Sequence, residues 1–168
     1  MSPYLRDLRA KVGTALVVLP SVAGVVFDEQ GRVLLIKHAN GYWTPPGGGI
    51  EPDEVPTDTL VREVWEETGL LVEPLSLIGV FGGPECRVHY ANGDTVSYVV
   101  TAFECRVKGG AARPDGRESL DVGFFAEEEL QPADLSTLAH VVLRAAFARA
   151  GDGGFQPPSW LPNNEARS

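Results

Sequence analysis

The stretch that decides the fold runs from Gly48 to Leu70 and reads GGIEPDEVPTDTLVREVWEETGL. Its first part follows two prolines and is rich in glycine. That composition neither continues a central strand nor starts a helix, so it predicts a loop with unusual backbone geometry. The second part predicts a helix over 56–68, because Pro56 suits a first helical position and Gly69 suits the residue that ends a helix.

The predicted helix gathers three carboxylates on one face. Glu63, Glu66 and Glu67 follow the spacing i, i+3, i+4, which places them side by side at ~100° per residue. Like charges this close repel unless a cation lies among them, and hard carboxylate oxygens suit Mg²⁺ or Mn²⁺ better than Zn²⁺. The opposite face is expected to pack against a sheet. It consists of Val61, Val64, Trp65 and Thr68.

The glycine loop at residues 47–49 complements this acidic face. Glycine lets the backbone approach a ligand closely, and carbonyl oxygens exposed there add to the oxygen ligands of a metal. A diphosphate held between loop and helix would have its charge neutralised, and a carboxylate acting as base would activate the attacking water. Each half alone has a plainer interpretation, since exposed glutamates are usually a solvated face and a glycine run is usually a turn.

The spacing of the two halves resembles the signature of the Nudix hydrolase family, whose members are MutT-like. Five residues separate Gly48 from Glu54, seven more precede Arg62, and the run Glu63 to Leu70 follows with every fixed position filled. Pro45, in the approach to this signature, stands where leucine is commoner. The resemblance implies an α/β fold with a mixed β-sheet sandwiched between helices. It also implies a pyrophosphohydrolase that uses Mg²⁺ or Mn²⁺.

The resemblance assigns a role to each matching residue. It implies that Glu66 and Glu67 bind metal and that Glu63 is a ligand or a base. The backbone carbonyl of Gly47 commonly joins the ligands. Arg62 is expected to hold Glu63 by an ion pair.

Two further acidic positions follow from the same resemblance. Glu54 is expected to support the glycine loop and a metal-bound water. Family members also often use an acidic residue from a loop after the central strands as ligand or base. Glu118, six residues before Phe124, is the best match here. Asp115 and Asp121 remain alternatives, as does the interpretation of Glu118 as a solvated loop charge.

Extended segments flank the signature. Residues 14–19 and 21–28 are expected as two extended segments divided at Pro20. Residues 32–37 contain a continuous apolar run, which predicts a strand buried on both faces and paired with 21–28 in a hairpin. Further elements are strands over 71–81, 96–107 and 122–125 and a helix over 134–149. This order predicts a mixed α/β sandwich.

The 168 residues fit one domain, predicted over 1–150 with a short N-terminal helix over 3–11. Residues 151–168 are rich in glycine and proline and predict a flexible tail. A basic and then apolar start over 6–19 imitates a secretory signal, but Pro20 interrupts it. No run reaches the ~18–20 apolar residues of a membrane span.

The composition excludes a broad basic surface, because the net charge is -9 and the pI is about 4.8. We therefore expect no nucleic-acid partner, although bound metal can reverse the sign of a site locally. Cys86 and Cys105 lie far apart without metal-ligand spacing and predict reduced, partly buried thiols in a cytoplasmic protein. His38, His89 and His140 show no ligand spacing either and are interpreted as structural or surface residues.

The sequence leaves the substrate open. Tyr42, Phe81, Arg87 and Tyr90 are candidates for substrate contacts, since they are predicted in or near loops that would border the site. The predicted reaction is hydrolysis of a nucleoside diphosphate linked to another moiety, with ADP-ribose, sugar nucleotides, dinucleoside polyphosphates and (d)NTPs as candidates. The alternatives are a catalytically silent Nudix domain that senses nucleotides and a plain acidic interaction domain. A homodimer is left open.

Overall fold

Both faces of strand β2 (Val33–Lys37) are buried, because alternate side chains enter two different hydrophobic cores. Leu34 packs in one core and Leu35 in the other, and neither is accessible to solvent. The computed structural model describes residues 3–148 and 154–155. The expected strand with two buried faces is therefore confirmed.

A mixed sheet forms the middle layer of the described structure. Its other strands are β1 (Val17–Phe27), β3 (Trp43–Thr44), β4 (Leu70–Phe81), β5 (Arg87–His89), β6 (Thr95–Gly110), β7 (Asp121–Phe125) and β8 (Gly154–Phe155). The order is β3-β2-β1-β6-β4-β8, with β5 paired to β6 and β7 paired to β2. The central pair β1 and β6 is parallel, whereas β2 and β4 run antiparallel to their neighbours in that pair.

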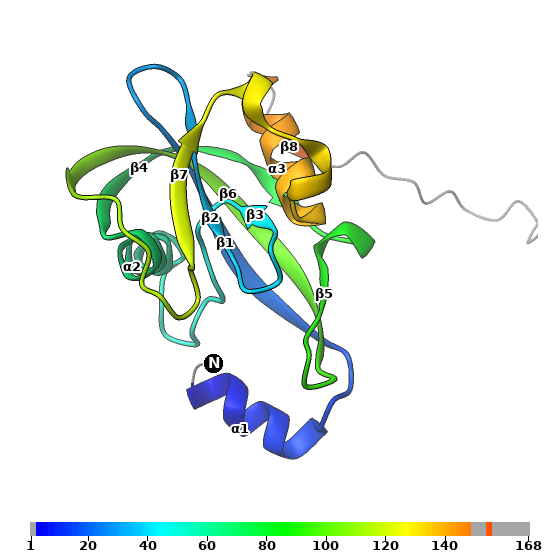
Figure 1. Cartoon of the computed structure of the whole chain (residues 1–168). Helices are drawn as coiled ribbons and strands as arrows, with labels where there is room; N and C mark the ends of the chain where they lie inside the picture. The colour runs from blue at the N-terminus through cyan, green and yellow to red at the C-terminus, as the bar shows by residue number, and fades with distance from the viewer. Residues whose placement is uncertain (1–2, 149–153, 156–168) are drawn as a thin grey trace, which may run out of the picture.

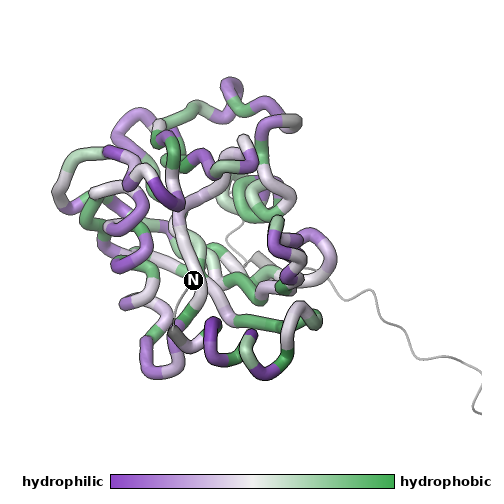
Figure 2. Tube along the Cα trace, turned by 60° about the horizontal axis from the view of Figure 1, so that its bottom comes forward, coloured by the Kyte–Doolittle hydropathy of each residue, from purple (hydrophilic) through white to green (hydrophobic). Residues whose placement is uncertain are grey.

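Two helices enclose this sheet. Helix α2 (Pro56–Thr68) packs on one core and α3 (Thr137–Phe147) on the other, so they lie on opposite sides of the sheet (Figure 1). The remaining helical segments are α1 (Pro3–Val12) and three short 3₁₀ turns at Pro84–Cys86, Glu127–Glu129 and Pro132–Asp134. Figure 2 shows hydrophilic stretches on both loops and helices, with hydrophobic stretches between them. The expected sandwich of a mixed sheet between helices is confirmed.

Helix α1, expected over 3–11, lies beyond the end of the sheet in Figure 1. Arg9 ties it to the body of the fold by donating to the carbonyl of Thr95 at 2.9 Å and to that of Ala15 at 2.6 Å. None of the described helices is long and apolar enough to cross a membrane.

Pro20 does not divide the first strand, which corrects the expectation of two extended segments. β1 runs through it, because Pro20 needs no N–H there and its carbonyl accepts the N–H of Ile50 at 3.1 Å. The C-terminal helix starts three residues later than predicted, where the Ser136 hydroxyl caps it by accepting the N–H of Ala139. The predicted tail over 151–168 lies outside the described residues, apart from β8.

Candidate active site

Helix α2 presents its acidic face because the opposite face is fixed in the core. Leu60 and Val64 are fully buried there, and Gly69 ends the helix in a left-handed conformation with φ of 69°. Trp65 is expected from the sequence to pack against the sheet. This expectation is wrong, because the residue is 48% exposed. Its position is ~100° around the helix from Val64, which puts it at the edge of the buried stripe.

The glycine loop is bonded to β1 like an additional strand. The carbonyl of Pro46 accepts the N–H of Gly24 at 2.8 Å, and the carbonyl of Gly48 accepts the N–H of Val22 at 2.9 Å. A β-carbon at Gly47 would overlap the carbonyl oxygen of Val22, so only glycine fits between these two hydrogen bonds.

Gly47 connects this loop to the acidic helix. Its N–H donates to Oε2 of Glu67 at 2.8 Å. The carbonyls of Pro46 and Gly48 on either side both point to β1. The role of the Gly47 carbonyl as a metal ligand stays a prediction.

Arg62 organises the carboxylates through a planar guanidinium with several donors. Nε and Nη2 bind the two oxygens of Glu54 at 2.7 and 2.8 Å, and Nη1 donates to Glu63 at 2.8 Å and to Glu66 at 3.3 Å. The hydroxyl of Thr59 adds a 2.8 Å hydrogen bond to Glu54. The expected ion pair between Arg62 and Glu63 is present, but the bidentate partner of the arginine is Glu54.

Burial raises the pKa values of two of these carboxylates. Glu67 is only 3% exposed, and burial, together with the charges of Glu63, Glu118 and Asp115, raises its pKa to about 8. Burial also raises the pKa of Glu63, although its ion pair with Arg62 opposes this. Burial disfavours the ionised form of these carboxylates, and a bound cation would stabilise that form.

Of the three acidic candidates after the central strands, Asp115 and Glu118 lie on the loop between β6 and β7, which is hydrogen-bonded to the end of α2. The charge of Glu118 raises the pKa of both Glu63 and Glu67. The next residue, Ser119, donates to the carbonyl of Glu67 at 2.6 Å, so this part of the loop contacts the end of α2. Asp115 also raises the pKa of Glu67, but its Oδ1 accepts several hydrogen bonds within its own loop. Asp121 starts β7 and accepts the N–H of the next residue at 2.8 Å.

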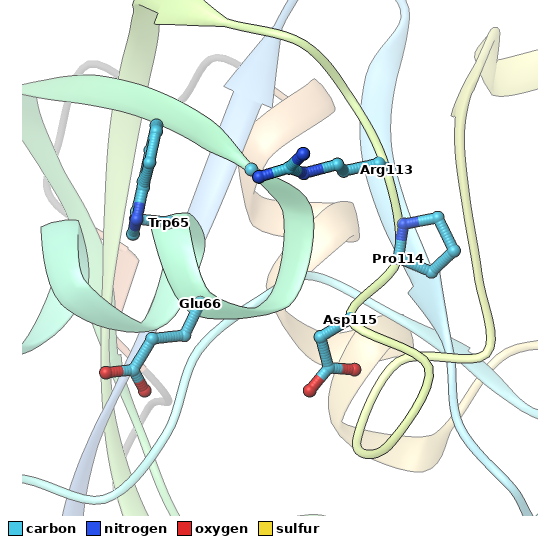
Figure 3. Close-up of a pocket in the computed structure, with 6 residues that line it drawn as sticks. Trp65, Glu66, Arg113, Pro114 and Asp115 are labelled. Atoms are coloured by element: carbon cyan, nitrogen blue, oxygen red, sulfur yellow. The ribbon is translucent and has the colours of Figure 1, made fainter.

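An open pocket of about 350 Å³ lies between the C-terminal end of α2 and this loop. The side chains of Trp65, Glu66, Arg113 and Asp115 line it (Figure 3). The Arg113 side chain extends over the end of the helix, and the carboxylates of Glu66 and Asp115 point to the same side. The pocket therefore adjoins the acidic face.

The four residues predicted to contact substrate differ in burial and setting. Phe81 is 4% exposed and belongs to the core on the α3 side, so its side chain is not at the surface. Tyr42 and Arg87 are exposed, on the turn before β3 and on β5. The Tyr90 hydroxyl lies 2.7 Å from the hydroxyl of Tyr98.

Tyr98 is a residue that the sequence did not single out. Burial raises the pKa of Tyr98, and its contacts with Tyr90 and the charge of Glu118 add to the shift. The signal available in the sequence was a polar aromatic group within the apolar strand β6. Such a residue is equally common as a core tyrosine, and its neighbour across the hairpin could not be predicted.

The oxygen atoms of the acidic face and the glycine loop are of the kind that binds a hard divalent cation. In this structure the carboxylates are hydrogen-bonded to other groups of the protein. Among the described residues, no three Asp, Glu, His or Cys side chains converge on one point. The fit rests on the buried carboxylate of Glu67, the neighbouring carboxylates of Glu63 and Glu66, and the carbonyl of Gly47, all of which are oxygen donors.

The histidines and cysteines lie outside this cluster. The histidine rings contact groups of the protein: His38 the carbonyl of Glu118, His89 the hydroxyl of Thr95, and His140 the carbonyl of Pro132. Cys86 and Cys105 are free, and both are buried, which is more than the partial burial predicted. Neither residue type supplies a ligand to the acidic face.

Fold and site together define an α/β domain in which an acidic helix face is held against a glycine loop. The NUDIX domain family matches residues 18–146. The chain belongs to the Nudix family, and the resemblance in the signature is confirmed.

The chain is similar to curated proteins and to solved structures of the same family. A "MutT-like protein" of Streptomyces ambofaciens is 41% identical over 66% of this chain and 65% of its own length. The "8-oxo-dGDP phosphatase NUDT18" of Mus musculus is 32% identical over 84% of this chain and 43% of its own length. The crystal structure of an ADP-ribose pyrophosphatase from Streptococcus suis is 25% identical and covers 82% of this chain and 96% of its own, with a TM-score of 0.63. The chain thus spans less than two thirds of the length of these two curated relatives.

Proposed function

We propose that this protein is a metal-dependent hydrolase that cleaves the diphosphate linkage of a nucleoside diphosphate joined to another moiety. The convergence of the acidic helix face with the glycine loop carries the proposal. Glu67 is buried and bonded to Gly47, and Glu63 packs against Gly48. The names of the relatives support the substrate class, since 8-oxo-dGDP and ADP-ribose both contain a nucleoside diphosphate.

Glu63, Glu66, Glu67 and the carbonyl of Gly47 would hold Mg²⁺ or Mn²⁺, which neutralises the charge of the diphosphate when bound. The remaining work falls to the protein. Arg62 favours the ionised form of Glu63 and fixes its direction through the 2.8 Å hydrogen bond. The loop orients one side of the substrate, because its backbone is bonded to β1.

Glu118 acts as the general base. It accepts a proton from water as the water oxygen bonds to one phosphorus atom. The bond from that phosphorus to the bridging oxygen breaks, and the bridging oxygen leaves with the other phosphate. Two observations support this role: the adjacent Ser119 donates to the carbonyl of Glu67, and the charge of Glu118 raises the pKa of Glu63 and Glu67.

The test incubates the protein with ADP-ribose, a nucleotide sugar, a dinucleoside polyphosphate, (d)NTPs and 8-oxo-dGDP in Mg²⁺, in Mn²⁺ or in EDTA. We expect turnover of at least one diphosphate substrate with a cation and none in EDTA. Glu66→Gln should lower kcat by at least about a hundredfold. The matched control is Glu128→Gln, an exposed glutamate on the 3₁₀ turn after β7, which should be unaffected.

Two results would contradict the proposal. Tight nucleotide binding without turnover of any substrate would favour the nucleotide-sensing alternative. Normal activity of Glu66→Gln would show that the acidic face takes no part in the reaction.

Reaction in ¹⁸O-labelled water identifies the phosphorus atom that is attacked in a substrate that is turned over, because the label appears in only one of the two phosphate products.

A further inference from the structure

The loop that carries Glu118 is held by polar contacts at both of its ends. The N–H of Arg113 donates to the carbonyl of Thr68 at 2.8 Å, which fixes the start of the loop to the end of α2. The N–H of Leu120 donates to the carbonyl of Lys37 at 2.8 Å, which fixes its end to β2. Its side chains are exposed apart from Ser119, so apolar packing contributes little to its position.

Asp115 and Ser119 close the loop on itself. Oδ1 of Asp115 accepts the N–H groups of Arg117, Glu118 and Ser119 at 2.9, 3.0 and 2.8 Å. In return, the N–H of Asp115 donates to the hydroxyl of Ser119 at 2.9 Å. Aspartate is suited to this arrangement, because its short side chain reaches backbone groups two to four residues further along.

Ser119 also connects the loop to the acidic helix. Its side chain is fully buried, and its hydroxyl donates to the carbonyl of Glu67 at 2.6 Å. That carbonyl belongs to the last turn of α2, where carbonyls lack partners within the helix. Because a hydroxyl has one proton, the 2.6 Å contact with Glu67 takes precedence over the 3.0 Å approach to Oδ1 of Asp115.

We infer that Asp115 and Ser119 are positioning residues, which hold Glu118 beside Glu63 and Glu67 through the closed loop and its hydroxyl contact with α2. The inference rests on the proposed role of Glu118 as base. A general base must lie within hydrogen-bond reach of the proton it removes, so a loop free to shift would lose catalysis without losing substrate. In this role Asp115 supplies a hydrogen-bond acceptor, and its negative charge is not required.

The experiment compares Asp115→Ala, Asp115→Asn and Ser119→Ala in the full chain. Asp115→Ala and Ser119→Ala should lower kcat by about 10–100-fold with KM changed less than about threefold. Asp115→Asn keeps an acceptor oxygen and should stay within about threefold of the unaltered protein. The control is Asp134→Ala, which removes an exposed aspartate from the 3₁₀ turn before α3.

A double substitution separates positioning from a direct role. If Asp115 acts through Glu118, Asp115→Ala combined with Glu118→Gln should be no slower than Glu118→Gln alone. Thermal melts and hydrogen exchange of the amides at 115–120 check that the variants fold and that the loop has loosened. Ser119→Ala removes one oxygen only, so it serves if Asp115→Ala does not fold.

Several outcomes would overturn the inference. Asp115→Asn as slow as Asp115→Ala would show that the charge itself is needed. Multiplied losses in the double variant would show that Asp115 acts independently of Glu118. Full activity of both Asp115→Ala and Ser119→Ala would show that the loop needs no such contacts. Full activity of Glu118→Gln would instead refute the proposed base, which distinguishes that failure from the others.

Discussion

The carboxylate of Glu63 occupies the space beside Gly48 where any other residue would place a β-carbon. Such an atom would lie 2.7 Å from Oε2 of Glu63 and closer still to Cδ and Oε1. The φ angle of Gly48 lies outside the left-handed region, so the requirement for glycine is one of space. The glycine of the signature is therefore paired with a carboxylate of the same signature, fifteen residues further along the chain.

Gly48→Ala should thus impair catalysis by displacing Glu63. We expect kcat/KM to fall by at least about tenfold, because misplacement of a site residue by about 1 Å is costly. Gly49→Ala is the matched control, since a β-carbon there meets no atom within 4 Å and the φ of Gly49 is also unstrained. Steady-state kinetics and circular dichroism provide the readout. Equal losses in both variants would mean that the loop backbone, rather than Glu63, is sensitive.

Arg62→Lys should destabilise the protein and slow the reaction. Lysine retains the charge but cannot bind both oxygens of Glu54 while also donating to Glu63. The loss of bidentate contacts should cost about 1–2 kcal/mol of unfolding free energy, measured by urea denaturation. Arg32→Lys is the control, because Arg32 pairs with Asp28 in an exposed turn where the change should cost less than about 0.5 kcal/mol. Similar costs at the two sites would contradict the special role of Arg62.

The acidic helix could be predicted from the sequence because its signals are local. Pro56 and Gly69 mark its ends, and the spacing of its glutamates requires only the helical period. Strand β2 could also be predicted, because its continuous apolar run indicates a strand buried on both faces. Pro20 shows the limit of such signals. Whether proline interrupts a strand depends on what faces its nitrogen, which a distant segment decides.

The parts of the site that could not be predicted are contacts between distant segments. The hydroxyl of Ser119 meets the carbonyl of Glu67 across 52 residues, and no local pattern marks that serine. Tyr90 and Tyr98 meet only because a hairpin brings them together. Trp65 differs, since its position at the edge of the buried stripe follows from the helical period. The helical period places it with Val61 and Thr68, but does not decide which side chain at the edge of that face stays exposed.

The raised pKa of Glu67 predicts a pH dependence of stability in EDTA. The folded pKa is about 8 against an ordinary 4.5, so the folded protein holds a proton that the unfolded chain releases above pH 4.5. This contribution is complete below pH 4.5 and is lost as the pH rises through 8. Glu67→Gln should therefore reduce the loss of stability over this range. At about pH 8 it should be roughly 1–3 kcal/mol more stable than the unaltered protein.

Urea denaturation in EDTA at about pH 5 and about pH 8 measures this effect. Glu66→Gln is the control, because it removes a carboxylate of the same helix whose side chain is 57% exposed. Its stability should follow that of the unaltered protein more closely than the stability of Glu67→Gln does. Parallel pH profiles for Glu67→Gln and the unaltered protein would contradict the prediction. The carboxyl of Glu67 would then titrate alike in the folded and unfolded states.

Helix α2 starts without a side-chain cap, so its stability can be raised at Val55. This residue is 58% exposed and has the extended conformation of an N-cap, with φ of −77° and ψ of 144°, but its side chain offers no acceptor. Threonine has nearly the same shape and adds an oxygen, so Val55→Thr should gain about 0.5–1 kcal/mol in urea denaturation with unchanged kcat. Val55→Ala, which adds no oxygen, should show no gain. Equal stability of the two variants would mean that the backbone already satisfies the first turn, where the N–H groups of Asp58 and Thr59 approach the carbonyl of Val55 at 2.9 and 3.1 Å.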